Sequence, residues 1–290
     1  MKQRILAAAI LSALLLQGCG GGSDGDGGSN QNHDTASNPN STAGRDSNSG
    51  KVEKNFVATA SAKYMLIPFN GYSLGRFEAQ KSVQDSDGAF KVLGPYRLGG
   101  DKTAVQDIAG NENFALGRWT YGTATQENSS TGAIESTLLQ QSQNLFWNYA
   151  VFNQYEAVAA GEKTCEASAF TRAYKTQGNG PIFAATTGTA KLNLLAADDA
   201  TLEVTLTSNN GQQSHTSTFY PGKKADYPVS SGIFSGSKVV NPAKSFVSNG
   251  EYQINFGQGL SNEVLMIVNY KNQFSATGPA YAGLAVFTCK

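Results

Sequence analysis

The sequence predicts an all-β domain, an antiparallel barrel or sandwich of about ten to twelve short strands with at most one short helix. Three observations favour this fold class. Apolar and polar residues alternate with period two in many short runs after residue 55. Gly, Asn, Asp and Pro, which favour turns, separate these runs. Residues 55–290 are also numerous enough to enclose one sizeable core.

The strands differ in how clearly they alternate. Segment 201–207 is the clearest, because Leu202, Val204 and Leu206 share one face. Segment 263–270 is apolar on both faces, which is typical of a central strand. The other predicted strands cover 56–66, 72–79, 114–125, 145–152, 164–174, 190–194, 251–256 and 281–289.

Segment 133–143 has no unique assignment. Ile134, Leu138 and Leu139 have a spacing that fits an amphipathic helix in a Gln-rich stretch. The same segment fits a strand equally well, so both structures remain open.

The N-terminus has the anatomy of an export signal. Lys2 and Arg4 precede an apolar run over residues 5–16, which is too short to span a bilayer. The sequence Leu16-Gln17-Gly18-Cys19 that follows resembles the lipobox of bacterial lipoproteins. This resemblance implies that residues 1–18 are removed and that Cys19 is lipidated. An ordinary signal that is cleaved elsewhere is the alternative.

Residues 19–54 are predicted to be a tether. The stretch 20–50 is rich in Gly, Ser, Asn and Asp and contains no large apolar residue, which predicts disorder. The domain organisation is therefore a signal (1–18), a lipidated tether (19–54) and one β domain (55–290). Gly20 is not the aspartate that marks inner-membrane retention in enteric lipoproteins, so the resemblance implies the outer membrane. We expect display at the cell surface, because a long tether suits a distant partner.

Charge and cysteines narrow the classes of partner. The formal net charge is zero, so no basic surface for nucleic acid is expected, and the lipid is the expected contact with the membrane. Cys165 and Cys289 are an even pair in an exported chain, which predicts a disulfide. Two isolated cysteines and a single histidine outside the tether disfavour a metal site, and no cofactor is predicted.

One motif has the form of a hydrolase nucleophile. Gly71-Tyr72-Ser73-Leu74-Gly75 matches G-x-S-x-G, and His215 follows later in the chain. An elbow of this kind lies deep in its domain, whereas Ser73 comes soon after the predicted start of the β domain. Pro68 also interrupts the strand that would precede it. We therefore predict no enzymatic activity, with a serine hydrolase that uses Ser73 as the alternative.

A short repeat suggests a second kind of site. Ser73-Leu74-Gly75-Arg76-Phe77 resembles Ala115-Leu116-Gly117-Arg118-Trp119. In a strand, each glycine shares a face with the aromatic residue that follows it, which gives the ring a place to lie. Arg76 and Arg118 occupy matching positions and are candidates for a paired anion clamp. The alternative is that these arginines only solvate a strand face.

Aromatic residues are the main candidates for binding. Both faces of the predicted strand 145–152 carry rings, which places it either between two packed layers or with one ring face exposed to a ligand. Trp and Tyr are good interface anchors when they are exposed. The candidate binding residues are Trp119, Tyr121, Phe146, Trp147, Tyr149 and Phe152.

These observations together favour a binding protein. A lipid anchor, a flexible tether and a β domain resemble the tethered β-barrel lipoproteins with which some Gram-negative bacteria capture host proteins or nutrient carriers. The resemblance implies a surface domain that binds a protein or a small apolar ligand. A structural or assembly lipoprotein of the outer membrane is the alternative.

The Cys19→Ser variant tests the anchor. We expect it to lose lipidation and to leave the membrane fraction or accumulate as uncleaved precursor, because a serine hydroxyl cannot replace the thiol. Fractionation with mass spectrometry of the N-terminus measures this. Unchanged processing and anchoring of the variant would show that the lipobox assignment is wrong.

Overall fold

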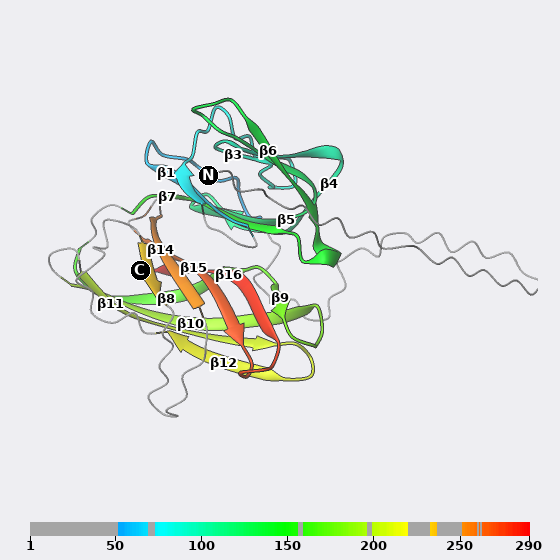
Figure 1. Ribbon diagram of the computed structural model, residues 1–290. Helices are drawn as coiled ribbons and strands as arrows, with labels where there is room; N and C mark the ends of the chain where they lie inside the picture. Colours follow the sequence, from blue (N-terminus) through cyan, green and yellow to red (C-terminus); the bar gives the residue numbers. More distant parts are fainter. Residues whose placement is uncertain are drawn as a thin grey trace, which may run out of the picture. The chain divides into compact units, whose positions relative to one another are not determined.

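The chain folds into two antiparallel β-sheets (Figure 1), in a computed structural model that describes residues 52–68, 73–155, 159–195, 199–219, 233–236, 251–259, 261 and 263–290. All of these residues belong to one compact unit, 42–290. Within them the structure contains strands and one short 3-10 helix, which confirms the predicted all-β fold. None of their helices has the length and apolarity to cross a membrane. The predicted signal, Cys19 and nearly all of the predicted tether lie outside the described residues.

The first sheet has seven strands. Six of them follow the order β2 (Ser73–Arg76), β1 (Ala62–Ile67), β7 (Trp147–Asn153), β5 (Phe114–Glu127), β4 (Tyr96–Asn111) and β3 (Val92–Leu93). The seventh, β6 (Ile134–Gln140), pairs with the C-terminal half of β5. Because β7 pairs with the N-terminal half of β5, β6 and β7 succeed one another along the same edge of that strand.

The second sheet has nine strands. Its main path runs through β12 (Ser214–Phe219), β11 (Asp199–Asn209), β10 (Phe183–Leu195), β8 (Gly161–Phe170), β16 (Ala280–Cys289), β15 (Val264–Gln273), β14 (Glu251–Gln258) and β13 (Ile233–Gly236). Strand β9 (Ala173–Gln177) continues β8 and, like β8, pairs with both β10 and β16. Strands β8 and β9 therefore follow one another in the same position of the sheet, between β10 and β16.

Apolar side chains form three layers. One cluster fills the inside of the nine-stranded sheet, around Met266 and Phe287. A second covers one face of the seven-stranded sheet, around Tyr64 and Trp119. The third contains residues of both sheets, for example Phe152 of β7 and Ile267 of β15. The two sheets therefore pack face to face, and strands such as β7 are buried on both sides.

The strand count is higher than predicted, because the described residues contain sixteen strands. The longest of them, β4, was not predicted at all. Its register against β5 shifts at three places, including the steps from Gly99 to Ala104 and from Gln106 to Ala109. Each bulge reverses the alternation, so no period-two signal survives along the strand. Segment 133–143 proves to be strand β6 followed by the 3-10 helix Gln141–Gln143.

The predicted disulfide is present. The Sγ atoms of Cys165 and Cys289 are 2.01 Å apart, and the two residues lie directly opposite each other on β8 and β16. Thr164 and Lys290 exchange backbone hydrogen bonds beside them, which places the cysteines in the closer, non-hydrogen-bonded pair. The bond closes a sequence separation of 124 residues and ties the last strand to the sheet. In chain-entropy terms a loop of this size stabilises the fold by about 4–5 kcal/mol.

Glycines in both copies of the short repeat accommodate tyrosine rings. Gly117 on β5 faces Tyr149 on β7, and a Cβ atom added there would lie 2.5 Å from the Tyr149 Oη atom. Gly75 on β2 faces Tyr64 on β1 in the same way. The rings therefore come from the neighbouring strand and not, as predicted, from the aromatic residue that follows each glycine. Burial raises the pKa of Tyr64 to about 12, with smaller contributions from nearby Tyr96 and Glu78.

Replacement of the buried glycine tests this packing. We expect Gly117→Ala to lower the free energy of unfolding by about 1–3 kcal/mol, because its methyl group would overlap the Tyr149 ring. Gly99→Ala in β4 is the matched control, since an added Cβ there meets no atom within 4 Å. Denaturant unfolding measures both variants. Equal effects of the two substitutions would contradict the proposed contact.

Candidate binding surface

Three of the predicted binding residues belong to the core of the seven-stranded sheet. Trp119 and Tyr149 are fully buried, and Trp147 is 8% exposed. The two indole rings stack with their centroids 6.0 Å apart. Trp119 Nε1 donates a hydrogen bond to the Phe90 carbonyl oxygen at 2.7 Å, and the Phe90 N–H donates to Tyr149 Oη at 3.0 Å. These hydrogen bonds and the ring stacking show that the three side chains stabilise the core of the seven-stranded sheet.

Phe146 and Phe152 are buried as well. Phe146 packs against Tyr174 with a centroid distance of 4.4 Å, and Phe152 lies in the apolar layer between the two sheets. The strand 145–152 therefore presents neither ring face to a ligand in this structure. Of the two alternatives drawn from the sequence, the strand lies between packed layers.

Arg76 and Arg118 do not form a clamp in this structure. Arg76 is exposed on the short edge strand β2. Arg118 has no exposed surface, and its Nη2 atom lies 2.5 Å from Oδ2 of Asp107. The guanidinium is thus already paired with an internal carboxylate, and the two arginines occupy different environments.

Asp107 also binds an arginine of the other sheet. Arg172, in the short link between β8 and β9, donates from Nε to Asp107 Oδ1 at 2.9 Å and from its backbone N–H to Oδ2 at 3.1 Å. Arg118 Nη1 donates to the Arg172 carbonyl oxygen at 3.0 Å. Asp107 sits at the bulge of β4 with φ of 51°, a conformation that Asp and Asn tolerate better than most residues. One carboxylate therefore links the two sheets.

Aromatic rings surround the buried cation. The Arg118 guanidinium lies 5.4–5.8 Å from three ring centroids, those of Phe146, Tyr174 and Phe183. Burial lowers the pKa of Arg118 and the nearby Asp107 carboxylate opposes this shift, so the arginine remains a cation. The rings replace part of its lost hydration. Sequence reasoning missed Asp107 and Arg172, because both lie where the strand pattern is interrupted.

Ser73 and His215 are placed on different sheets. The Ser73 hydroxyl on β2 is 2.7 Å from the Tyr96 hydroxyl. His215 on β12 packs its ring against Phe274, and burial lowers its pKa. The described residues around Ser73 form a strand pair and not a strand-to-helix turn. A catalytic role for Ser73 thus gains no geometric support here.

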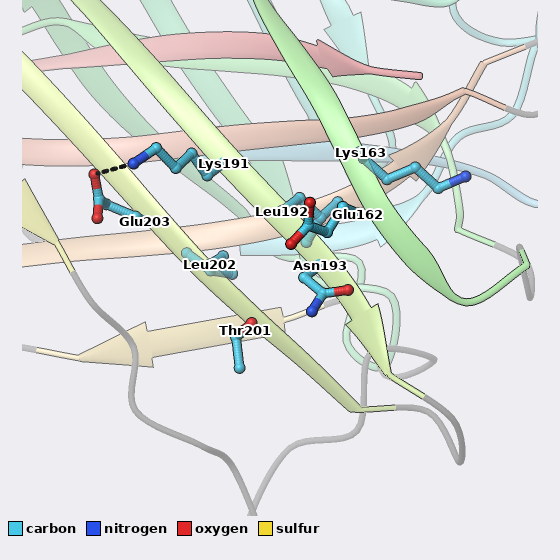
Figure 2. Close-up of a pocket in the computed structure, with 8 residues that line it drawn as sticks. All are labelled: Glu162, Lys163, Lys191, Leu192, Asn193, Thr201, Leu202 and Glu203. Atoms are coloured by element: carbon cyan, nitrogen blue, oxygen red, sulfur yellow. Dashed lines mark ion pairs between the residues drawn. The ribbon is translucent and has the colours of Figure 1, made fainter.

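A pocket of about 400 Å³ lies at β8, β10 and β11 (Figure 2). Its apolar residues are Leu192 and Leu202, and two lysines and two glutamates are among the others: Glu162, Lys163, Lys191 and Glu203. Figure 2 shows Lys191 directed toward Glu203, with 3.5 Å between Nζ and Oε1, and Lys163 directed away from them. The lining therefore carries equal numbers of acidic and basic side chains.

A second, more polar cleft of about 470 Å³ has walls from both sheets. Glu53, Glu166 and Glu263 line it together with Lys290. Lys290 Nζ lies 3.4 Å from Glu263 Oε1. Within the described residues, no group of three or more His, Cys, Asp and Glu side chains is arranged to hold a metal ion.

The hairpin of β5 and β6 carries the most exposed apolar surface. Six large hydrophobic residues are exposed in the described part of the chain, and three of them belong to this hairpin: Tyr121 (46%), Ile134 (68%) and Leu138 (60%). The strand register places all three on one face of the sheet. Hydroxyl-bearing residues occupy positions between them: Thr123, Thr125 and Ser136. We call this surface the hairpin face.

The opposite face of the same hairpin is core. Leu139 and Ala124 are buried there with Leu98 of β4. On that side of β6 only Leu139 reaches the core, because Glu135 and Thr137, which share its face, are exposed. Tyr121 is thus the single predicted binding residue that the structure leaves accessible. Ile134 and Leu138 were noticed in the sequence, but only as evidence for a helix or a strand.

Comparisons with protein-family models, with curated proteins and with solved structures find no match for this chain.

The Asp107→Asn variant tests the buried ion pair. We expect it to lose about 3–5 kcal/mol of unfolding free energy, because two arginines then lack their shared carboxylate. Asparagine keeps the backbone conformation accessible, so the charge is the main change. Arg76→Ala, the exposed counterpart in the repeat, is expected to change stability by less than about 0.5 kcal/mol. Denaturant unfolding of both variants measures the cost of leaving the two arginines without their carboxylate, and equal stability of Asp107→Asn and Arg76→Ala would contradict the buried pairing.

Proposed function

We propose that the protein is a lipid-anchored, surface-displayed β domain that binds a partner protein at the bacterial envelope. The observation that carries the proposal is the hairpin face. Tyr121, Ile134 and Leu138 lie on one face of a single hairpin and make up half of the exposed large apolar residues in the described part of the chain. Contiguous exposed apolar surface marks interaction sites in soluble domains.

The shape of this surface favours a protein over a small ligand. The hairpin face is one side of a β-sheet, and the lining of neither described pocket includes its three apolar residues. Small apolar ligands require concave sites that enclose most of their surface. Exposed tyrosine, such as Tyr121 here, is instead a residue that protein interfaces favour.

The export signal and the lipobox resemblance supply the location. Leu16 to Cys19 supports lipidation, and the Gly- and Ser-rich residues 20–50 would let the domain reach beyond its anchor. We infer display at the outer surface, where a tethered binding domain meets soluble partners. An assembly role inside the envelope would place the same surface against another envelope component.

Paired variants test the binding surface. We expect Leu138→Ser and Tyr121→Ala to lose 2 kcal/mol or more of binding free energy, or about 30-fold in Kd, with melting temperatures near wild type. Ile182→Ser is the control, because Ile182 is 51% exposed but lies outside the hairpin. A pulldown from host fluids and envelope extract identifies the partner, and titration then measures its affinity. Retained binding by both hairpin variants would reject this surface.

The buried ring Trp147 separates binding from folding in the same experiment. We expect Trp147→Ala to cost about 3–5 kcal/mol of stability, because truncation leaves a cavity beside Trp119. Its binding should fall only as far as its folded fraction falls. Selective loss of binding by a stable Trp147→Ala protein would show instead that the ring contacts the partner.

A further inference from the structure

Strand β6 has one unpaired edge. In the described residues it pairs with β5 alone, apart from a single bridge between Gln140 and Leu145. The N–H groups of Gln140 and Leu145 each donate to the carbonyl oxygen of the other, at 2.8 and 3.2 Å. Both backbone groups of Gln140 therefore point away from β5.

The alternation of backbone groups fixes the rest of the edge. At the other end of the hairpin, Asn128 N–H donates to the Ala133 carbonyl oxygen at 2.8 Å, so Ala133 points toward the β5 side. Residues along an antiparallel strand alternate in this direction. Ile134, Ser136 and Leu138 therefore direct their N–H and C=O groups outward. Since Gln140 is already paired, the open edge covers residues 134–138 and is centred on Ser136.

This edge is complementary to itself. In an antiparallel pair with a second copy about a twofold axis at Ser136, Ile134 lies opposite Leu138 of the other copy. All the outward backbone groups of residues 134–138 then find partners. Glu135 lies opposite Thr137, so no like charges face each other. The formal net charge, zero for the whole sequence and −2 once Lys2 and Arg4 are removed with the signal, adds little general repulsion between copies.

Neighbouring registers are poorer. An axis at Glu135 would place two carboxylates directly opposite each other across the strands, which is destabilising. An axis at Thr137 would bring Ile134 opposite Gln140, whose backbone groups Leu145 already occupies. The axis at Ser136 is the register that satisfies hydrogen bonding, charge and apolar contact together.

We propose that β6 pairs with β6 of a second copy of this chain through residues 134–138. The pairing joins the seven-stranded sheets of the two copies edge to edge. It places Ile134 and Leu138 of both copies on one continuous surface. It stands on the edge geometry alone and does not depend on the partner protein of the proposed function. A contact of five residues per copy is small, so the association is weak and depends on concentration.

Proline at the centre of the edge tests the pairing. The Ser136 N–H points away from β5, so Ser136→Pro removes a bond to the second copy and leaves the β5–β6 bonds intact. Ser136→Ala keeps the N–H and is the matched control. Sedimentation equilibrium of the full chain in non-lipidated form (Cys19→Ser) measures self-association. We expect wild type and Ser136→Ala to associate alike and Ser136→Pro to associate at least tenfold more weakly.

Amide hydrogen exchange identifies the contact. At high protein concentration we expect new protection at the outward amides of Ile134, Ser136 and Leu138, while Glu135 and Thr137 are protected at every concentration. Leu138→Lys keeps all backbone groups and should also weaken association. It replaces Ser136→Pro as the test variant if the proline variant unfolds at a low temperature. A chain that stays monomeric at millimolar concentration overturns the proposal. So does association that survives both variants, or protection of these amides only when another protein is added.

Discussion

One carboxylate holds the two sheets in a defined relation. Asp107 forms an ion pair with Arg118 of its own sheet and accepts hydrogen bonds from Arg172 of the other, in a region with almost no solvent contact. Apolar faces alone permit sheets to slide or rotate over each other, because dispersion contacts have little directional preference. The Asp107 contacts have fixed geometry, and a displaced packing would leave at least one charge buried without its partner. We infer that this pair selects one packing of the sheets rather than adding much net stability.

The central strands are buried on both sides, which explains why the candidate aromatic residues and Arg118 lie inside the protein. Leu116 and Arg118 share a strand face, and in a two-sided sheet that face turns toward the other sheet and not toward water. The rings of β7 divide between the two faces in the same way, with Tyr149 on one side and Phe152 on the other. Sequence alternation assigns residues to faces, but it does not tell whether the polar-looking face meets solvent. The core and the strand positions were therefore predictable, whereas the role of Arg118 was not.

Two further differences have local causes. Strand β4 was missed because its bulges near Asp107 break the alternation that identifies strands. Segment 133–143 stayed open because a spacing of four residues, as between Ile134 and Leu138, fits one face of a helix and one face of a strand equally. The structure shows that the segment is a strand, because Leu139 is buried on the opposite side from the exposed Leu138. Tyr121, one of the candidate binding residues, is exposed, but its neighbours on β6 follow from pairing that no local pattern reveals.

The open edge of β6 differs from the other sheet edges in the described residues. Proteins protect such edges by keeping them short or by placing charges and proline on them. The edge strands β2, β3 and β13 have only two to four residues, whereas β12 has six and no large aliphatic residue. Strand β6 has seven residues, a single charge and no proline, with Ile134 and Leu138 exposed beside its outward backbone groups. Within the described residues neither shortness nor proline limits its pairing, and a single charge opposes it, so an edge of this composition favours a partner strand. A lipid anchor would add to this tendency, because confinement to one membrane raises the local concentration of copies far above that in solution.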